Sequence, residues 1–357
     1  MMFNTEKLAK KVSGFADAAL IFSEENRRYF TQFPSSDGLL LILKDSALFF
    51  TDSRYTEAAA KAIGEEYVFD SSNLYEKLNN LFKENEVTNV AVENDKLTLM
   101  EFDTLKEKLP GCTFITSSLL SEAIEEIRIV KTEEEIEKIK AAQKIAEDAF
   151  NHILTFIKPG ITEKEVSLEL DFYMLSHGAE AVSFETIAVA GKNSSMPHGV
   201  PGDYKLQNGD FLTMDFGATV DGYHSDMTRT VAIGNVSDEM KAVYETVLSA
   251  QLKGLEALKD GISGVDADKA ARDVIENAGY GKNFGHGLGH GVGVEIHESP
   301  RLSPKAPHTL KAGHVVTVEP GIYLPGKFGV RIEDMAVITE NGSINLTSCP
   351  KELIVIG

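Results

Sequence analysis

Cysteine is scarce in this sequence. Among 357 residues, Cys112 and Cys349 lie far apart and show none of the close spacing that is typical of a thiolate metal site. Two isolated cysteines suit free thiols in a reducing compartment. We therefore expect a cytoplasmic protein.

Long apolar segments and positive charge are also in short supply. The N-terminal stretch MMFNTEKLAKKVSG has no apolar core, so we expect no signal peptide. The longest uninterrupted apolar run near it, Leu39–Leu43, is far too short to cross a bilayer. Lysine and arginine number 35 against 55 acidic residues, which gives a net charge of −20. That excess disfavours nucleic acid and anionic membrane surfaces as general partners.

The length and the patterning predict two domains. A chain of 357 residues, 43% of them hydrophobic, has ample capacity for two cores. Residues 1–125 alternate strand-like and helix-like runs and predict a smaller α/β domain. In residues 126–357, a capping box such as Thr132 with Glu135 opens a long helix. We expect this second domain to be α+β, with a curved antiparallel sheet under helices, and no internal repeat is visible in it.

A hairpin is predicted around Asp221-Gly222, where two apolar-rich runs meet. Asp-Gly is a strong hairpin signal, because a type I′ turn needs positive φ at both central residues. With that turn, Asp215 falls opposite Thr228, and Asp226 becomes a diagonal neighbour of Asp215 on the same face. Two ions about 3.5–4 Å apart fit between carboxylates that are roughly 7–8 Å apart at the backbone. Taken singly, each Asp is better explained as a solvated strand position.

Three further candidates follow in the last third of the chain. Residues 285–300 read GHGLGHGVGVEIHESP, a glycine-rich setting that contains His290. Glycines let the backbone approach a ligand closely, and imidazole is the commonest nitrogen donor to a metal. Glu319 in VEPGIY and Glu333 in VRIEDMAVI lie inside apolar runs typical of buried strands. A buried carboxylate is costly unless it is paired or bound to a metal.

Together these residues make a hard, oxygen-rich set of four carboxylates and one imidazole. Such a set suits two divalent ions that share bridging ligands, and two such ions turn water into a nucleophile at neutral pH. The sequence therefore predicts a dinuclear hydrolase site. Its expected ligands are Asp215, Asp226, His290, Glu319 and Glu333.

The order and spacing of the set resemble those of the "pita-bread" metallopeptidases, the family of methionine aminopeptidase, aminopeptidase P and Xaa-Pro dipeptidase (prolidase). The resemblance covers nearly the whole chain, and every ligand position is filled. It implies that Asp215 binds one ion and that His290 and Glu319 hold the other. It also implies that Asp226 and Glu333 bridge the two ions and that Glu319 shuttles a proton.

The same resemblance gives roles to residues outside the ligand set. His198, in SSMPHGVP, matches a family histidine that contacts the substrate or stabilises the tetrahedral intermediate. His297 matches a second histidine, near the scissile carbonyl. Creatinase shares the fold but lacks the full set of ligands, so the intact set argues against a creatinase.

The N-terminal domain implies a substrate class. Its segments ENRRYFTQF and FFTDSRYTEAA resemble the Xaa-Pro-cleaving and creatinase branches, which implies small peptide substrates with proline at the second position. Arg301 matches a prolidase position where a guanidinium can engage the substrate carboxylate, although an exposed loop arginine explains it equally well. We favour an Xaa-Pro dipeptidase. The alternatives are an aminopeptidase P acting on longer peptides and, with less support, a non-enzymatic binding protein on this fold.

The sequence places weaker constraints on the identity of the metal and on the oligomeric state. Oxygen-rich ligation favours Mn(II) or Co(II), with Zn(II) and Fe(II) as alternatives, because affinity alone does not select among them. The resemblance also implies a homodimer in which the N-terminal domain helps to limit substrate length.

Overall fold

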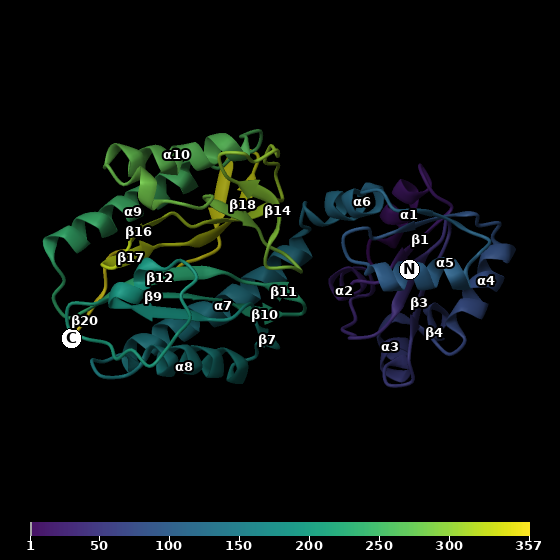
Figure 1. Cartoon of the computed structure of the whole chain (residues 1–357), viewed down its shortest axis with the longest axis horizontal. Helices are drawn as coiled ribbons and strands as arrows, with labels where there is room; N and C mark the ends of the chain where they lie inside the picture. The colour runs from purple at the N-terminus through teal and green to yellow at the C-terminus, as the bar shows by residue number, and fades with distance from the viewer. Residues whose placement is uncertain (1) are drawn as a thin grey trace. The chain divides into compact units, whose positions relative to one another are not determined.

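The computed structural model describes residues 2–357. The chain divides into two units, Met1–Arg128 and Ile129–Gly357, each built around its own sheets (Figure 1). Among the described residues, no helix has both the length and the apolar character needed to span a membrane.

The first unit is a six-stranded mixed sheet with helices. The apolar strands β1 (Ala18–Ile21) and β2 (Leu39–Ile42) are buried along their whole length, as expected for strands covered on both faces. The strand order is β4-β3-β2-β1-β5-β6. The remaining elements are α1 (Thr5–Val12), α2 (Glu24–Thr31), β3 (Ala47–Thr51), α3 (Thr56–Ile63), β4 (Val68–Asp70), α4 (Leu74–Glu84), β5 (Asn89–Val92), α5 (Leu99–Lys108), β6 (Thr113–Ile115) and α6 (Leu119–Arg128).

The second unit contains two pairs of helices with strands between them. Figure 1 shows β9, β12, β16 and β17 between the α7–α8 pair and the α9–α10 pair. Each pair covers its own apolar core. The helices span α7 (Glu133–Phe156), α8 (Glu163–Ser176), α9 (Asp238–Ala257) and α10 (Gly264–Asn277).

Almost all strand pairs of the second unit are antiparallel, as the sequence predicts; β12 with β20 is parallel. The two main sheets have the orders β20-β12-β9-β8 and β14-β13-β15-β18-β19, and β17 contacts both β9 and β12. The strands are β7 (Ala181–Val182), β8 (Ile187–Ala190), β9 (Phe211–Phe216), β10 (Ala218–Val220), β11 (Tyr223–His224), β12 (Met227–Ile233), β13 (Gly289–Gly291), β14 (Glu298–Leu302), β15 (Val315–Val318), β16 (Gly321–Leu324), β17 (Phe328–Arg331), β18 (Asp334–Thr339), β19 (Gly342–Asn345) and β20 (Val355–Ile356).

The two helix pairs are joined by similar short segments, a repeat that the structure makes visible. KPGIT at 158–162 leads from α7 to α8, and KDGIS at 259–263 leads from α9 to α10. Gly160 and Gly261 have φ of 95° and 83°, which favours glycine. The residue that closes each motif caps the following helix with its hydroxyl. The two five-residue segments share only three identical residues, which is why the sequence hides the repeat.

The repeat extends to the strands that carry two predicted ligands. The loop at Gly160 pairs with Leu206, and the loop at Gly261 pairs with Leu310, through the same two backbone hydrogen bonds of 2.8–2.9 Å. Each of these leucines begins an L-x-x-G turn, and Asp215 and Glu319 both lie six residues after its glycine. The two halves of the unit thus deliver one carboxylate each from equivalent places.

Candidate metal centre and substrate cavity

Asp215 and Asp226 lie on one hairpin. Asp221-Gly222 forms its turn with φ of 49° and 81°, and Thr228 lies opposite Asp215, so the predicted turn and register are confirmed. Asp226 is buried, and Asp215 is half-buried. The local sequence therefore fixes how these two carboxylates face each other.

The hairpin is interrupted beside Asp226, which the sequence did not predict. Gly217 separates β9 from β10, and Ser225 and Asp226 separate β11 from β12. The Ser225 hydroxyl accepts a hydrogen bond from the Ala218 N–H at 2.9 Å. A Cβ on Gly217 would lie 1.9 Å from the carbonyl oxygen of Ser225. Glycine is required there for the strands to approach so closely.

His290 lies in the short strand β13 between two glycines. A Cβ on Gly289 or Gly291 would lie 2.1 or 2.2 Å from a backbone oxygen of the neighbouring chain segments. The ring Nδ1 lies 3.0 Å from the Gly291 carbonyl, which can only accept, so Nδ1 carries the hydrogen. Nε2 therefore presents its lone pair, 3.5 Å from Asp226 Oδ2 and 3.4 Å from Glu319 Oε1.

Glu319 and Glu333 lie at strand ends and not inside strands as the apolar runs suggested. Glu319 follows β15 directly, and Glu333 lies between β17 and β18. The Thr317 hydroxyl donates to Glu319 Oε1 at 3.2 Å, and the Thr228 hydroxyl donates to Glu333 Oε2 at 2.7 Å. Each glutamate is thus held by one hydroxyl and keeps free oxygen lone pairs.

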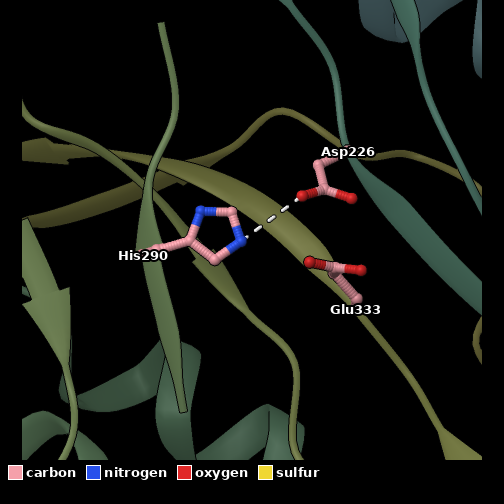
Figure 2. Close-up of side chains that lie close together, drawn as sticks. All are labelled: Asp226, His290 and Glu333. Atoms are coloured by element: carbon pink, nitrogen blue, oxygen red, sulfur yellow. Dashed lines mark ion pairs between the residues drawn. The ribbon is translucent and has the colours of Figure 1, made fainter. Parts of the chain in front are cut away.

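These side chains gather at one point. Asp226, His290 and Glu333 each offer a ligand atom within 4.8 Å of the others, and Figure 2 shows the imidazole directed at both carboxylates. The group lines a cavity of about 540 Å³. The other predicted site residues in the same cavity wall are His198, Asp215, His297, Arg301 and Glu319.

The cluster carries more negative charge than its surroundings neutralise. Burial, followed by repulsion from neighbouring carboxylates, raises the pKa of Asp226 and of Glu333 well above the usual values. Burial also raises the pKa of Glu319 to about 8 and lowers the pKa of His290 to about 3. Carboxyl groups whose pKa values are raised this far stay ionised at neutral pH only when additional cations lie beside them.

Arg331 is the buried cation that organises the polar groups around the cluster. Its guanidinium donates to Asp215 Oδ2 at 2.5 Å, to the Thr228 hydroxyl at 3.0 Å and to the Tyr323 hydroxyl at 2.8 Å. The Tyr323 hydroxyl also lies 3.1 Å from His286 Nε2. One side chain thus fixes Asp215 and links it to the wall of the cavity.

The three predicted substrate contacts line the same cavity as the ligand cluster. The His297 ring lies edge-on to the His290 ring, with centroids 4.4 Å apart. Arg301 is exposed on β14 and pairs in register with His290 on β13. His198 is exposed in a loop between two prolines. The fold therefore brings all three close to the ligand cluster.

Sequence reasoning missed two residues that hold this site. Thr228 and Thr317 orient the glutamates through their hydroxyls. Thr228 was already expected opposite Asp215, and that position was the one available signal for its role. The role of Thr317 depends on the direction of its side chain, which the sequence does not give.

The comparisons agree with this geometry. Residues 137–340 match the model of metallopeptidase family M24, and residues 6–130 match the creatinase/prolidase N-terminal domain. The chain belongs to metallopeptidase family M24. The predicted fold, a pita-bread unit preceded by a smaller creatinase-like unit, is thereby confirmed.

Some of the similar proteins are named dipeptidases and others aminopeptidases. An Xaa-Pro dipeptidase of Pyrococcus horikoshii is 37% identical over 344 residues, which cover 95% of this chain and 94% of the relative. A solved Xaa-Pro dipeptidase from Bacillus anthracis is 42% identical, with a TM-score of 0.93 over 99% of this chain and 100% of the other. A solved X-Pro aminopeptidase from Thermotoga maritima is 38% identical, with a TM-score of 0.91 over 98% and 99% of the two chains.

Proposed function

We propose that this chain is a dinuclear metal-dependent peptidase that hydrolyses the bond between an N-terminal residue and a following proline, with Xaa-Pro dipeptides as its preferred substrates. The observation that carries the proposal is the single cavity whose wall holds all five expected ligands together with His198, His297 and Arg301. The Xaa-Pro dipeptidases among the similar proteins support the same substrate class.

The residues fit two divalent cations. Asp215 Oδ1 is buried and has no hydrogen-bond partner among residues 2–357, so it is available as a ligand. Asp215 would hold one ion, and His290 and Glu319 would hold the other. Asp226 and Glu333 would serve as ligands to both. Mn(II) or Co(II) suits this set, with Zn(II) and Fe(II) as alternatives.

The reaction needs a nucleophile, a proton acceptor and a stabilised oxyanion. When bound, the ions supply an acidified water and polarise the scissile carbonyl. Glu319, oriented by the Thr317 hydroxyl, accepts the proton of the attacking water and passes it to the leaving proline nitrogen. A carboxylate in the wall of the cavity thus carries out the proton transfer.

His198 and His297 donate hydrogen bonds to the carbonyl oxygen as its negative charge develops. Burial, with Arg301 nearby, lowers the pKa of His297, so its ring is neutral at neutral pH and still has one N–H to donate. Arg301 binds the free carboxylate of the proline through its guanidinium fork. That contact favours dipeptides over longer peptides.

We also propose a homodimer and a cytoplasmic location. The two cysteines are free, which suits a reducing compartment. The homodimer rests on the family resemblance alone, and light scattering of the purified protein would test it.

The decisive experiment compares hydrolysis of Ala-Pro and Ala-Pro-Ala-Ala by the Mn(II)-loaded protein, with the products separated by chromatography. Cleavage of the dipeptide alone would establish a dipeptidase. Cleavage of the longer peptide would establish an aminopeptidase P and remove Arg301 from the substrate site. Activity on neither peptide would favour a binding protein on this fold.

Asp226→Ala tests the metal assignment. Loss of a bridging ligand should abolish turnover and lower metal content, measured by elemental analysis. Substantial turnover in the metal-loaded variant would contradict the dinuclear proposal.

A further inference from the structure

A buried ion pair lies directly behind His297. Glu298, the next residue, has a side chain that is 6% exposed, and its Oε2 lies 2.9 Å from Lys131 Nζ, whose side chain is 1% exposed. The other oxygen, Oε1, accepts the backbone N–H of Glu295 at 3.1 Å. The carboxylate therefore ties the loop before His297 to the start of the second unit.

The loop is shaped around this carboxylate. A Cβ on Gly293 would lie 2.5 Å from Glu298 Oε2, so glycine leaves the room that the carboxylate fills. The Gly293 N–H donates to the Glu295 carbonyl at 3.1 Å, and the Gly293 carbonyl accepts the His224 N–H at 2.9 Å. Residues 293–298 thus form a loop held by internal hydrogen bonds, and its first residue is bonded to β11.

Lys131 is a fixed anchor. Its backbone N–H donates to the Gly313 carbonyl at 2.8 Å, and the next residue, Thr132, caps α7 through a capping box with Glu135. A charged side chain that starts from such a rigid place presents its ammonium at a defined point. The Glu298 carboxylate therefore meets this ammonium at a fixed position.

A buried ion pair contributes little net stability, but removal of one partner leaves an uncompensated charge that the structure must relieve. Displacement of the 293–298 loop, which the Glu298 carboxylate holds through Glu295, is one such relief. Ile296 and His297 of that loop line the cavity, and the His297 ring lies against His290. Displacement of about 1 Å at a reacting group can cost about 100-fold in rate.

We infer that Lys131 and Glu298 are positioning residues that hold His297 in place beside the ligand cluster. The inference rests on the proposed function, in which His297 donates to the developing oxyanion. Neither Lys131 nor Glu298 is among the residues that line the cavity, so the pair acts through the loop.

The test is a double-mutant cycle between the pair and His297. We expect Lys131→Met and Glu298→Gln each to lower kcat on Ala-Pro about 10–100-fold, with KM and metal content within about twofold of wild type. In a His297→Ala background the same changes should lower kcat no further. Lys144→Met, which removes an exposed lysine paired with Asp148 on α7, is the control for a lysine-to-methionine change and should leave kcat unchanged.

A second readout does not depend on turnover. The imidazole resonance of His297, identified by its loss in His297→Ala, is recorded in the Zn(II)-loaded protein because this d¹⁰ ion is diamagnetic. We expect that resonance to shift or broaden in both pair variants and to stay in place in Lys144→Met. Glu298→Gln keeps the volume and the acceptor for Glu295, so it serves if Lys131→Met does not fold.

The outcomes separate the two proposals. Equal losses of kcat in the wild-type and His297→Ala backgrounds, or an unmoved His297 resonance, would overturn the positioning role. A wild-type protein that cleaves no Xaa-Pro peptide would overturn the proposed function, and the resonance would then decide the positioning role alone.

Discussion

At the scale of single residues, the Thr228 hydroxyl links Glu333 to Arg331. It donates to Glu333 Oε2 at 2.7 Å and accepts from Arg331 Nε at 3.0 Å. A hydroxyl can do both at once through a single atom, whereas an ionised carboxylate has no hydrogen to donate. Thr228 therefore sets the orientation of an expected bridging ligand and of the cation that pairs with Asp215.

We predict that Thr228→Val weakens metal binding without abolishing it. The change keeps the shape but leaves Glu333 and Arg331 each without one buried partner, and loss of such an outer contact typically costs about 10–100-fold in metal affinity. Titration with Mn(II), followed by activity, would measure it, and excess metal should restore most of the turnover. Thr246→Val on the exposed face of α9 is the control, and equal affinities in the two variants would contradict the prediction.

His297→Ala should have the opposite effect from Thr228→Val: it should lower kcat and leave metal binding unchanged. Removal of one donor to a developing oxyanion typically costs about 100–1000-fold in kcat. The ring is not among the expected ligands, so metal content should stay at the wild-type level. Elemental analysis beside kcat on Ala-Pro checks both parts, and loss of metal would show that His297 has been given the wrong role.

At the scale of elements, the hairpin that carries Asp215 and Asp226 depends on a glycine at position 217. A Cβ at Gly217 would meet the Ser225 carbonyl oxygen at 1.9 Å, and Ser225 is followed directly by Asp226. We predict that Gly217→Ala separates the strands, at a cost of about 1–3 kcal/mol or more, and moves Asp226 out of the cluster. Thermal unfolding and metal content would measure the two effects.

Gly342→Ala is the matched control. Gly342 begins β19, and a Cβ there would have no heavy atom within 4 Å. It should leave both the unfolding midpoint and the metal content near wild type. Equal behaviour of the two variants would mean that the close approach at Gly217 has no consequence for the site.

The two L-x-x-G turns are closed by different chemistry. In the first, the Asp210 carboxylate accepts the Gln207 N–H at 2.9 Å; in the second, His314 Nδ1 accepts the Lys311 N–H at 3.2 Å. An imidazole can accept there only while that nitrogen is unprotonated. Burial, with Lys131 and Lys311 nearby, lowers the pKa of His314 to about 4.

This difference predicts a pH dependence of stability. The unfolded chain binds a proton at His314 near pH 6.5, whereas the folded chain does so near pH 4. The contribution of His314 is therefore complete above about pH 6.5 and is lost as the pH falls from 6.5 towards 4. His314→Asn keeps an acceptor without the titration, so its denaturation midpoint should fall less over that range. Parallel curves for the two proteins would contradict the prediction.

The same elements show what a sequence can and cannot predict. The register of Asp215 against Thr228 follows from Asp221-Gly222, because a two-residue turn fixes every pair of the hairpin. The ion pair of Lys131 and Glu298 joins residues 167 positions apart and could not be predicted, because it depends on how the two halves of the unit pack. The types of the expected ligands follow from the sequence pattern, but the threonines that orient these residues depend on side-chain directions.

At the scale of the whole molecule, a chain with a net charge of −20 also places buried carboxylates that repel one another in its second unit. Cations that bind there relieve this repulsion in the folded chain only, since the unfolded chain does not assemble the cluster. Metal binding is therefore linked to the stability of the unit Ile129–Gly357 and not to that of Met1–Arg128, which contributes none of the expected ligands.

We predict that chelation lowers one of two thermal transitions. Metal at a free concentration of 100 times its dissociation constant stabilises the folded state by about 2.7 kcal/mol. For a unit of this size, that energy raises the unfolding midpoint by about 5–10 °C. Calorimetry with Mn(II) and with EDTA should move the transition of the second unit and leave that of the first in place. In Asp226→Ala the shift should shrink or vanish. An equal shift of both transitions would mean that the two units unfold together, and no shift in the wild type would mean that the cluster does not hold metal.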